Sequence, residues 1–161
     1  MPVPEDKLSE IMAFDFDALS VLVGEPPGVN YNIGLVTLTL QPAGLEETSA
    51  SKMPWLLQTD GRGESLFQPS SQVSDNVDLI YMGYVRPDPQ RFPDLSAPQI
   101  RRGLMADISQ VLDIAEHRQA AGADALVFDR SRTWESFDDP LGKWSLFVIT
   151  ETVFFHREIG S

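Results

Sequence analysis

Cysteine is absent from this chain, and histidine occurs only as His117 and His156. The absence of cysteine excludes disulfide bonds and fits a reducing compartment. A metal site would need both histidines joined by carboxylates, and no H-x-x-x-H spacing is present. We therefore expect no metal and no cofactor. We expect His117 to lie near a helix end and His156 to occupy an exposed strand position.

Basic residues are scarce, because 12 Lys and Arg stand against 24 Asp and Glu, for a net charge of -12. General nucleic-acid binding needs a basic face that neutralises phosphates, and this chain has no basic run. The acidic surface serves solubility, or it repels DNA as the wall of a passage would.

Several other signals are missing. No run approaches the roughly 20 apolar residues that span a bilayer, and Met1–Lys7 does not resemble the start of a secretory signal. There is no Gly-x-Ser-x-Gly elbow and no glycine-rich phosphate loop. Three carboxylate pairs occur, and we expect them to face water: Asp15/Asp17, Glu46/Glu47 and Asp138/Asp139.

Hydropathy patterns divide the first half of the chain into a helix and three strands. The helix covers Glu5–Val23, with Asp15 and Asp17 off its apolar stripe. The three predicted strands are a long, half-buried one at Tyr31–Gln41, a short one at Met53–Gln58 and a third at Val73–Arg86. A turn is predicted at Asp60–Gly63, before the third strand. Gly83 inside the last strand indicates a bulge or a close backbone approach.

The last third begins with a helix from Ser96 to Gly122, opened by a Ser96/Gln99 capping box. A short apolar strand at Ala125–Phe128, a polar loop at Arg130–Gly142 and a long strand at Trp144–Arg157 follow. The sum is one α+β domain over residues 1–161, with an antiparallel or mixed sheet of about four to five strands and two main helices. Segments 42–52, 60–72 and 130–142 are expected to be long loops or arms, and Glu64–Gln72 within the second of them adds either a ragged strand or an arm.

The 130–142 segment combines arginines with aromatics, which is the composition of subunit contacts. We predict an interface with other subunits or partners that uses Arg130, Arg132, Trp134, Phe137 and Phe154.

The order of these segments resembles the tail-terminator, or neck, proteins of long-tailed bacteriophages. The resemblance rests on Met53-Pro54-Trp55-Leu56 with its following turn, and on Val77–Arg86 ending in Gly-Tyr-Val-Arg. It continues through the capped helix and Arg130–Trp134 to Pro140-Leu141-Gly142 and the closing strand. It covers most of the chain from about residue 35 onward.

The resemblance implies a structural virion protein without catalysis, assembled in the host cytoplasm. It implies a hexameric ring that caps the tail tube, joins it to the head connector, and lets genomic DNA pass without specific binding. The expected partners are further copies of the chain, the tail-tube protein and the connector, without a membrane. The long 42–52 and 60–72 segments are interpreted as arms that contact the tube, the sheath or the connector.

Three alternatives stay open at this stage. The chain is another neck or tail component, such as a connector or tube subunit. It is a small enzyme that assembles a site from His117 or His156 and nearby acids. It is a cellular binding module that works through the loop around Trp134.

Overall fold

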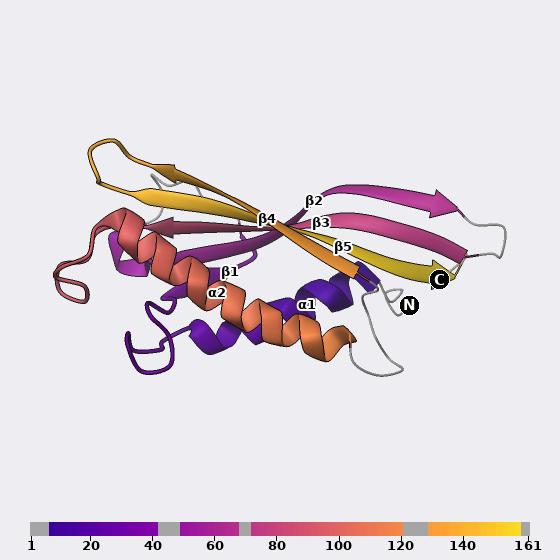
Figure 1. The fold of residues 1–161 in the computed structure, drawn as a ribbon, viewed down its shortest axis with the longest axis horizontal. Coiled ribbons are helices and arrows are strands. Elements are labelled where there is room, and N and C mark those ends of the chain that lie inside the picture. The colour runs from indigo at the N-terminus through magenta and orange to yellow at the C-terminus, as the bar shows by residue number, and fades with distance from the viewer. Residues whose placement is uncertain (1–6, 42–48, 68–71, 121–128, 159–161) are drawn as a thin grey trace.

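Two helices lie side by side across one face of a twisted five-stranded sheet (Figure 1). The computed structural model describes residues 7–41, 49–67, 72–120 and 129–158. Helix α1 spans Lys7–Leu19 and continues into a 3-10 turn, η1, at Ser20–Leu22, and α2 spans Ala97–Ala120. The predicted α+β class with a mixed sheet and two helices is confirmed.

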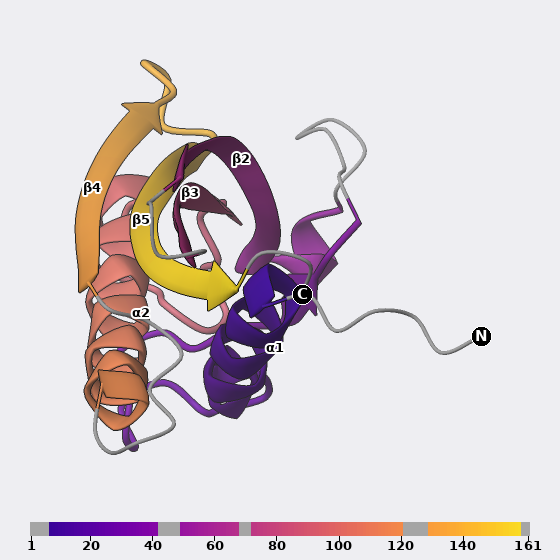
Figure 2. The same ribbon diagram turned by 90° about the vertical axis from the view of Figure 1, so that its right-hand side faces the viewer.

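The sheet has the order β1-β2-β3-β5-β4. Its strands are β1 (Thr37–Thr39), β2 (Trp55–Phe67), β3 (Gln72–Val85), β4 (Asp129–Asp138) and β5 (Ser145–Glu158). Only the β1–β2 pair is parallel. Viewed along its long axis, the sheet curls over the helices (Figure 2). The far ends of β2, β3 and β5 extend past both helices (Figure 1).

The core forms where the inner face of the central strands meets the helices. Leu79 and Tyr81 of β3 lie beside Phe147 and Ile149 of β5, and all four are buried in one cluster with α1 and α2. Alternate β3 residues face the other way, as the period of two requires. There Tyr84 joins a second, smaller cluster whose other members are Met53, Trp55 and Leu57.

The predicted capping box opens α2. Ser96 N donates to Gln99 Oε1 over 2.8 Å, and Gln99 N donates to Ser96 Oγ over 3.4 Å. Two backbone N–H groups of the first turn thereby gain partners. The predicted helix end at Gly122 and the apolar Ala125–Phe128 strand lie outside the described residues.

The prediction of a long strand over Tyr31–Gln41 is wrong, because only Thr37–Thr39 pairs as a strand. The cause is Asp107, buried in the middle of α2. Its carboxylate accepts the backbone N–H groups of Asn32, Ile33 and Gly34 at 2.8, 2.8 and 3.0 Å. These donors are therefore unavailable to a sheet ladder, and Gly34 adopts a positive φ of 74°.

The turn predicted at Asp60–Gly63 is also wrong. Strand β2 runs through it to Phe67 and absorbs it as a register shift against β3 between Asp60 and Gly63. A bulge accommodates an extra residue without ending a strand, so its glycines give the same sequence signal as a turn. Of the strand and the arm that stayed open for Glu64–Gln72, the structure has a strand as far as Phe67, and 68–71 lie outside the described residues.

The third correction concerns the predicted polar loop at 130–142. Residues as far as Asp138 form β4, which pairs with β5 over ten consecutive positions. The segment lacks apolar alternation because the side chains on its inner face are charged and paired there. Only a short turn at 139–144 connects β4 to β5.

Gly83 marks a close approach and not a bulge, because its register with Leu56 and Phe147 is uninterrupted. A Cβ atom there would overlap the Phe147 ring.

We predict that Gly83→Ala destabilises the fold by about 1–3 kcal/mol, the usual cost of overpacking a core. Urea unfolding would measure the loss. Gly63→Ala is the control, since its Cβ would lie 3.4 Å from Val77 Cγ2. Adding Phe147→Leu to Gly83→Ala should recover part of the loss, and equal stability of the two glycine variants would contradict the steric explanation.

Candidate interaction surface

Strand β4 forms one margin of the sheet. It pairs with β5 on one side, without a register shift, and no described residue pairs with its other side. Its ten residues include neither proline nor lysine. Natural sheets protect an edge with bulges, prolines, lysines or inward-pointing charges. Strand β4 has only the last of these, Arg130 and Arg132, and both are paired within the subunit, so its backbone edge stays regular and open to another chain.

Arg130 attaches β4 to the body of the protein. Its Nη1 lies 2.8 Å from Asp15 Oδ2 on α1 and 2.7 Å from Glu151 Oε2 on β5. The Arg130 side chain is 7% exposed, and both carboxylates are fully buried. A charge buried to this degree must be paired, so this arginine fixes the distance between β4 and α1.

Arg132 extends the same ion-pair cluster to α2. Its Nε donates to Glu151 Oε1 over 2.6 Å, and its Nη1 donates to Asp113 Oδ1 over 2.9 Å. Two arginines of β4 therefore connect three carboxylates that come from α1, α2 and β5. We call Asp15, Asp113, Arg130, Arg132 and Glu151 the arginine clamp.

Two polar core residues extend the hydrogen bonds of the clamp into the interior. Tyr81 Oη donates to Asp15 Oδ2 over 2.9 Å, and Gln58 Nε2 donates to Tyr81 Oη over 3.3 Å. Burial raises the pKa of Tyr81 well above its usual value, with the Asp15 charge adding to the shift. Tyr81 therefore stays a neutral hydrogen-bond donor at neutral pH.

Two opposing effects set the charge states of Asp15 and Arg130, the pair at the centre of the arginine clamp. Burial raises the pKa of Asp15, although the hydrogen bond and the charge of Arg130 oppose the increase. Burial alone lowers the pKa of Arg130, but Asp15 and Glu151 more than compensate, so the net shift is upward. Arg130 is thus permanently charged, and the arrangement serves attachment. The prediction that Asp15 faces water is wrong, because it lies on the buried stripe with Ile11 and Leu19.

A second anchor holds the hairpin end of β4 to the start of α2. Arg101 Nε donates to Asp138 Oδ1 over 3.2 Å and to Ser145 Oγ over 3.0 Å. Ser145 Oγ also donates to Asp138 Oδ1. The Ser145 hydrogen bond, followed by the charge of Arg101, lowers the pKa of Asp138. Asp138, which was expected simply to face water, is therefore part of a connection between β4 and α2.

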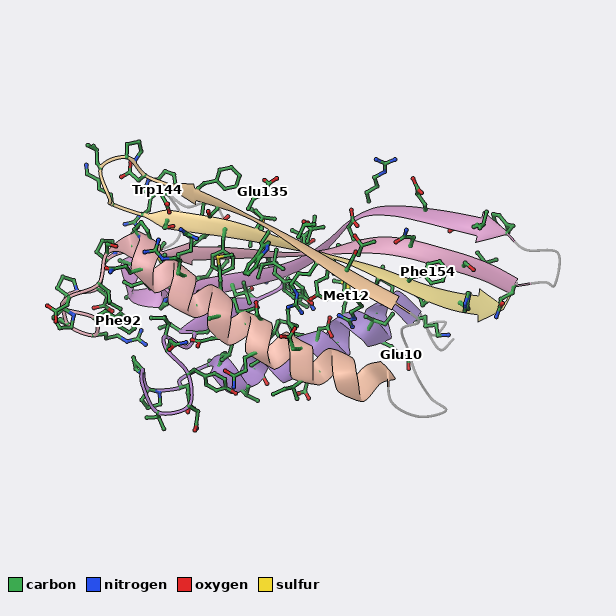
Figure 3. The ribbon with its side chains drawn as sticks, in the orientation of Figure 1. Glu10, Met12, Phe92, Glu135, Trp144 and Phe154 are labelled. Carbon is green, nitrogen blue, oxygen red and sulfur yellow. The ribbon has the colours of Figure 1, made fainter. Side chains whose placement is uncertain are left out.

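The structure separates the five predicted interface residues. Arg130 and Arg132 point inward and are engaged within the subunit. Trp134 and Phe137 are 59% and 46% exposed on β4. Phe154 lies toward the other end of β5, far from Glu135 and Trp144 near the hairpin (Figure 3). Phe137 pairs with Leu146, so about 27 Å of strand separates it from Phe154.

A groove of about 390 Å³ runs between the two helices, on the side away from the sheet. Its lining is apolar except for Asp17 and the Tyr31 hydroxyl. Phe14, Val21 and Ile114 form its walls and remain 36%, 52% and 49% exposed. Exposed apolar side chains gathered along a groove mark a contact site. Sequence periodicity assigned the α1 stripe to the core and gave no sign of this second apolar strip.

The two histidines lie on separate elements. His117 is in the last turns of α2, and its side chain is outside the description. His156 is on β5, half-buried, with Nδ1 2.9 Å from Ser74 Oγ and its ring edge-on to Phe154. Among the side chains that the structure describes, no group of three or more His, Asp or Glu is placed to hold a metal ion.

No family model matches the chain, and no curated protein matches it either. No helix within the described ranges is long and apolar enough to cross a bilayer. The interpretation of the surface therefore depends on its geometry.

We predict that Arg130→Met destabilises the protein by about 3–5 kcal/mol, because it leaves the Asp15 charge buried without its cation. Chemical denaturation would measure the change. Arg62→Met is the control, since Arg62 pairs with Glu64 at the surface with both side chains more than two-thirds exposed. That variant should change stability by less than about 1 kcal/mol. Equal losses in the two variants would contradict a stabilising clamp.

The two shifted aspartates predict opposite pH dependences. Because the pKa of Asp15 is raised in the folded state, its contribution to stability is complete below pH 3.8. That contribution is lost as pH rises through the pKa of Asp15 in the folded state. Asp15→Asn should therefore gain stability relative to wild type as pH rises from 3.8 through the raised native pKa of Asp15. The lowered pKa of Asp138 gives stability that is fully present above pH 3.8 and is lost as pH falls below 3.8, so the stability deficit of Asp138→Asn should stay constant above 3.8 and shrink below it. Urea titrations at several pH values would test both slopes. Parallel slopes would refute the assignment.

Proposed function

We propose that this chain is a ring-forming structural subunit of the neck of a long-tailed bacteriophage. In this role it terminates the tail tube and joins it to the head connector. The observation that carries the proposal is β4, a rigid and open sheet edge with Trp134 and Phe137 exposed on it. The order of elements, which resembles that of tail terminators, supports the same assignment.

Rings need two different contact surfaces on each subunit. A contact between unlike surfaces closes into a ring when its rotation permits, whereas a contact between like surfaces stops at a dimer. The two margins of this sheet differ. At one margin β4 offers a regular edge, and at the other β1 pairs with only the first three residues of β2. The rest of β2 carries a bulge, which protects an edge from pairing.

The charge of the chain fits a passage for DNA. A net charge of -12 on each copy gives a ring of six copies a charge of 6 × (-12) = -72. Such a ring repels phosphates over about a Debye length of 8–10 Å. DNA can then move through it without being held.

Electron microscopy and mass measurement test the proposal together. Six subunits of 17.9 kDa give 6 × 17.9, or about 107 kDa, and class averages should show six-fold rings. In phage particles that contain the chain, antibody labelling should mark the junction between head and tail. Labelling along the tube would favour a tube subunit, and labelling inside the head vertex would favour a connector. A stable monomer absent from virions would refute the proposal.

We predict that Trp134→Ala weakens ring assembly by about tenfold or more while leaving the fold intact, because aromatic anchors dominate interfaces and this one is mostly exposed in the subunit. Light scattering across a dilution series would measure assembly, and circular dichroism would measure folding. Val29→Ala, at a position between η1 and β1 that is 67% exposed and is not part of β4, is the control. Unchanged assembly would remove Trp134 from the interface.

A further inference from the structure

We infer that the tip of the β4–β5 hairpin of one copy docks in the groove between α1 and α2 of the next copy. The inference depends on the ring proposed above and specifies one of its contacts. We define the tip as Pro140–Lys143 and the groove by the walls already named, Phe14, Val21 and Ile114.

The tip presents the most exposed large apolar side chain of the described residues. Leu141 is 77% exposed. The turn beneath it is tied by Gly142 N to Asp139 O at 2.9 Å and by Asp139 N to Trp144 O at 3.1 Å. Gly142 takes the positive φ of 73° that the turn requires. Leu141 is thus displayed on a rigid support, which lowers the entropic cost of binding.

The groove matches the tip in size and character. The groove has a volume of about 390 Å³, which is far larger than a leucine side chain and leaves room for Pro140 as well. Its walls are apolar, and one carboxylate, that of Asp17, lines it. Burial of Leu141 there would remove a mostly exposed apolar side chain from water.

Charge complementarity selects this tip over other exposed apolar residues. Lys143 follows Leu141 by two positions and is exposed, and no described residue forms an ion pair with its ammonium group. The nearby Asp139 carboxylate accepts the Lys143 backbone N–H over 3.0 Å, which directs it into the turn. With Leu141 in the groove, Lys143 is placed to meet Asp17 at the rim. In a chain with few cations, such a pairing is specific.

The tip cannot fill the groove of its own subunit. The Arg101 anchor holds the hairpin end against the first turns of α2. The groove lies along the second half of α2, at Val111–Ala115, about 15 Å or more farther along the helix axis. Figure 1 shows the hairpin end above the start of α2, whereas the second half of α2 lies farther along, toward the middle of the molecule. Contact between a tip and a groove must therefore join two copies.

Cysteine crosslinking tests the contact, because the chain has no cysteine of its own. In the double variant Leu141→Cys/Val21→Cys, mild oxidation should give a covalent ladder that ends at the closed ring. Either single variant should give no intersubunit bond above background. The control double variant Leu141→Cys/Val29→Cys places the second thiol outside the groove and should not form the ladder.

Charge reversal supplies an independent readout. Lys143→Glu and Asp17→Lys should each raise the dissociation constant of the ring by about tenfold, and the two together should restore it. Wild-type rings with neither ladder nor rescue would overturn this contact and leave the ring itself standing. A wild-type chain that stays monomeric at every concentration would overturn the proposed function, and this contact with it.

Discussion

The structure depends on one guanidinium group placed between two buried carboxylates. Arg130 binds Asp15 and Glu151 with almost no access to water, so neither β4 nor α1 can shift without exposing an unpaired charge to the core. Hydrophobic packing holds α1, α2 and the central strands together. Of its described side chains, strand β4 contributes none to that core; its backbone pairs with β5, and ion pairs fix its position against the two helices. Directional contacts of this kind fix a geometry more narrowly than apolar ones do.

The position of β4 in turn defines what the molecule offers to other chains. If β4 were loose, Trp134 and Phe137 would sample many orientations, and binding would have to order them at a cost. The arginine clamp and the Arg101 anchor hold the strand near its start and at its hairpin end. The surface is therefore formed before any partner arrives. The groove between α1 and α2 is also formed in advance, because each helix packs on the sheet through the side opposite the groove.

Much of the fold could be predicted from local patterns, and the errors at β4 and in the 31–36 region share one cause. The capped α2 and strands β3 and β5 carry clear periodicity and were located correctly. The sequence of β4 predicts a loop because the residues that face inward, Arg130 and Arg132, are charged. Their partners lie on α1, α2 and β5, and no window of sequence contains them. The strand prediction for the 31–36 region is wrong for the same reason, because Asp107, which binds its backbone, is more than 70 positions away in the sequence. Long-range polar contacts determined the surface, and single-sequence reasoning does not detect them.

The pairing between β3 and β5 predicts how the subunit responds to mechanical force. Strands β3 and β5 pair over fourteen consecutive positions, Gln72–Val85 against Ser145–Glu158, with no shift in register. A force that slides these strands past each other loads the whole row of hydrogen bonds at once, whereas a force that peels them apart loads one bond at a time. We therefore expect the subunit to resist tension along its strands far better than tension across them. Single-molecule pulling along the two directions would measure the difference.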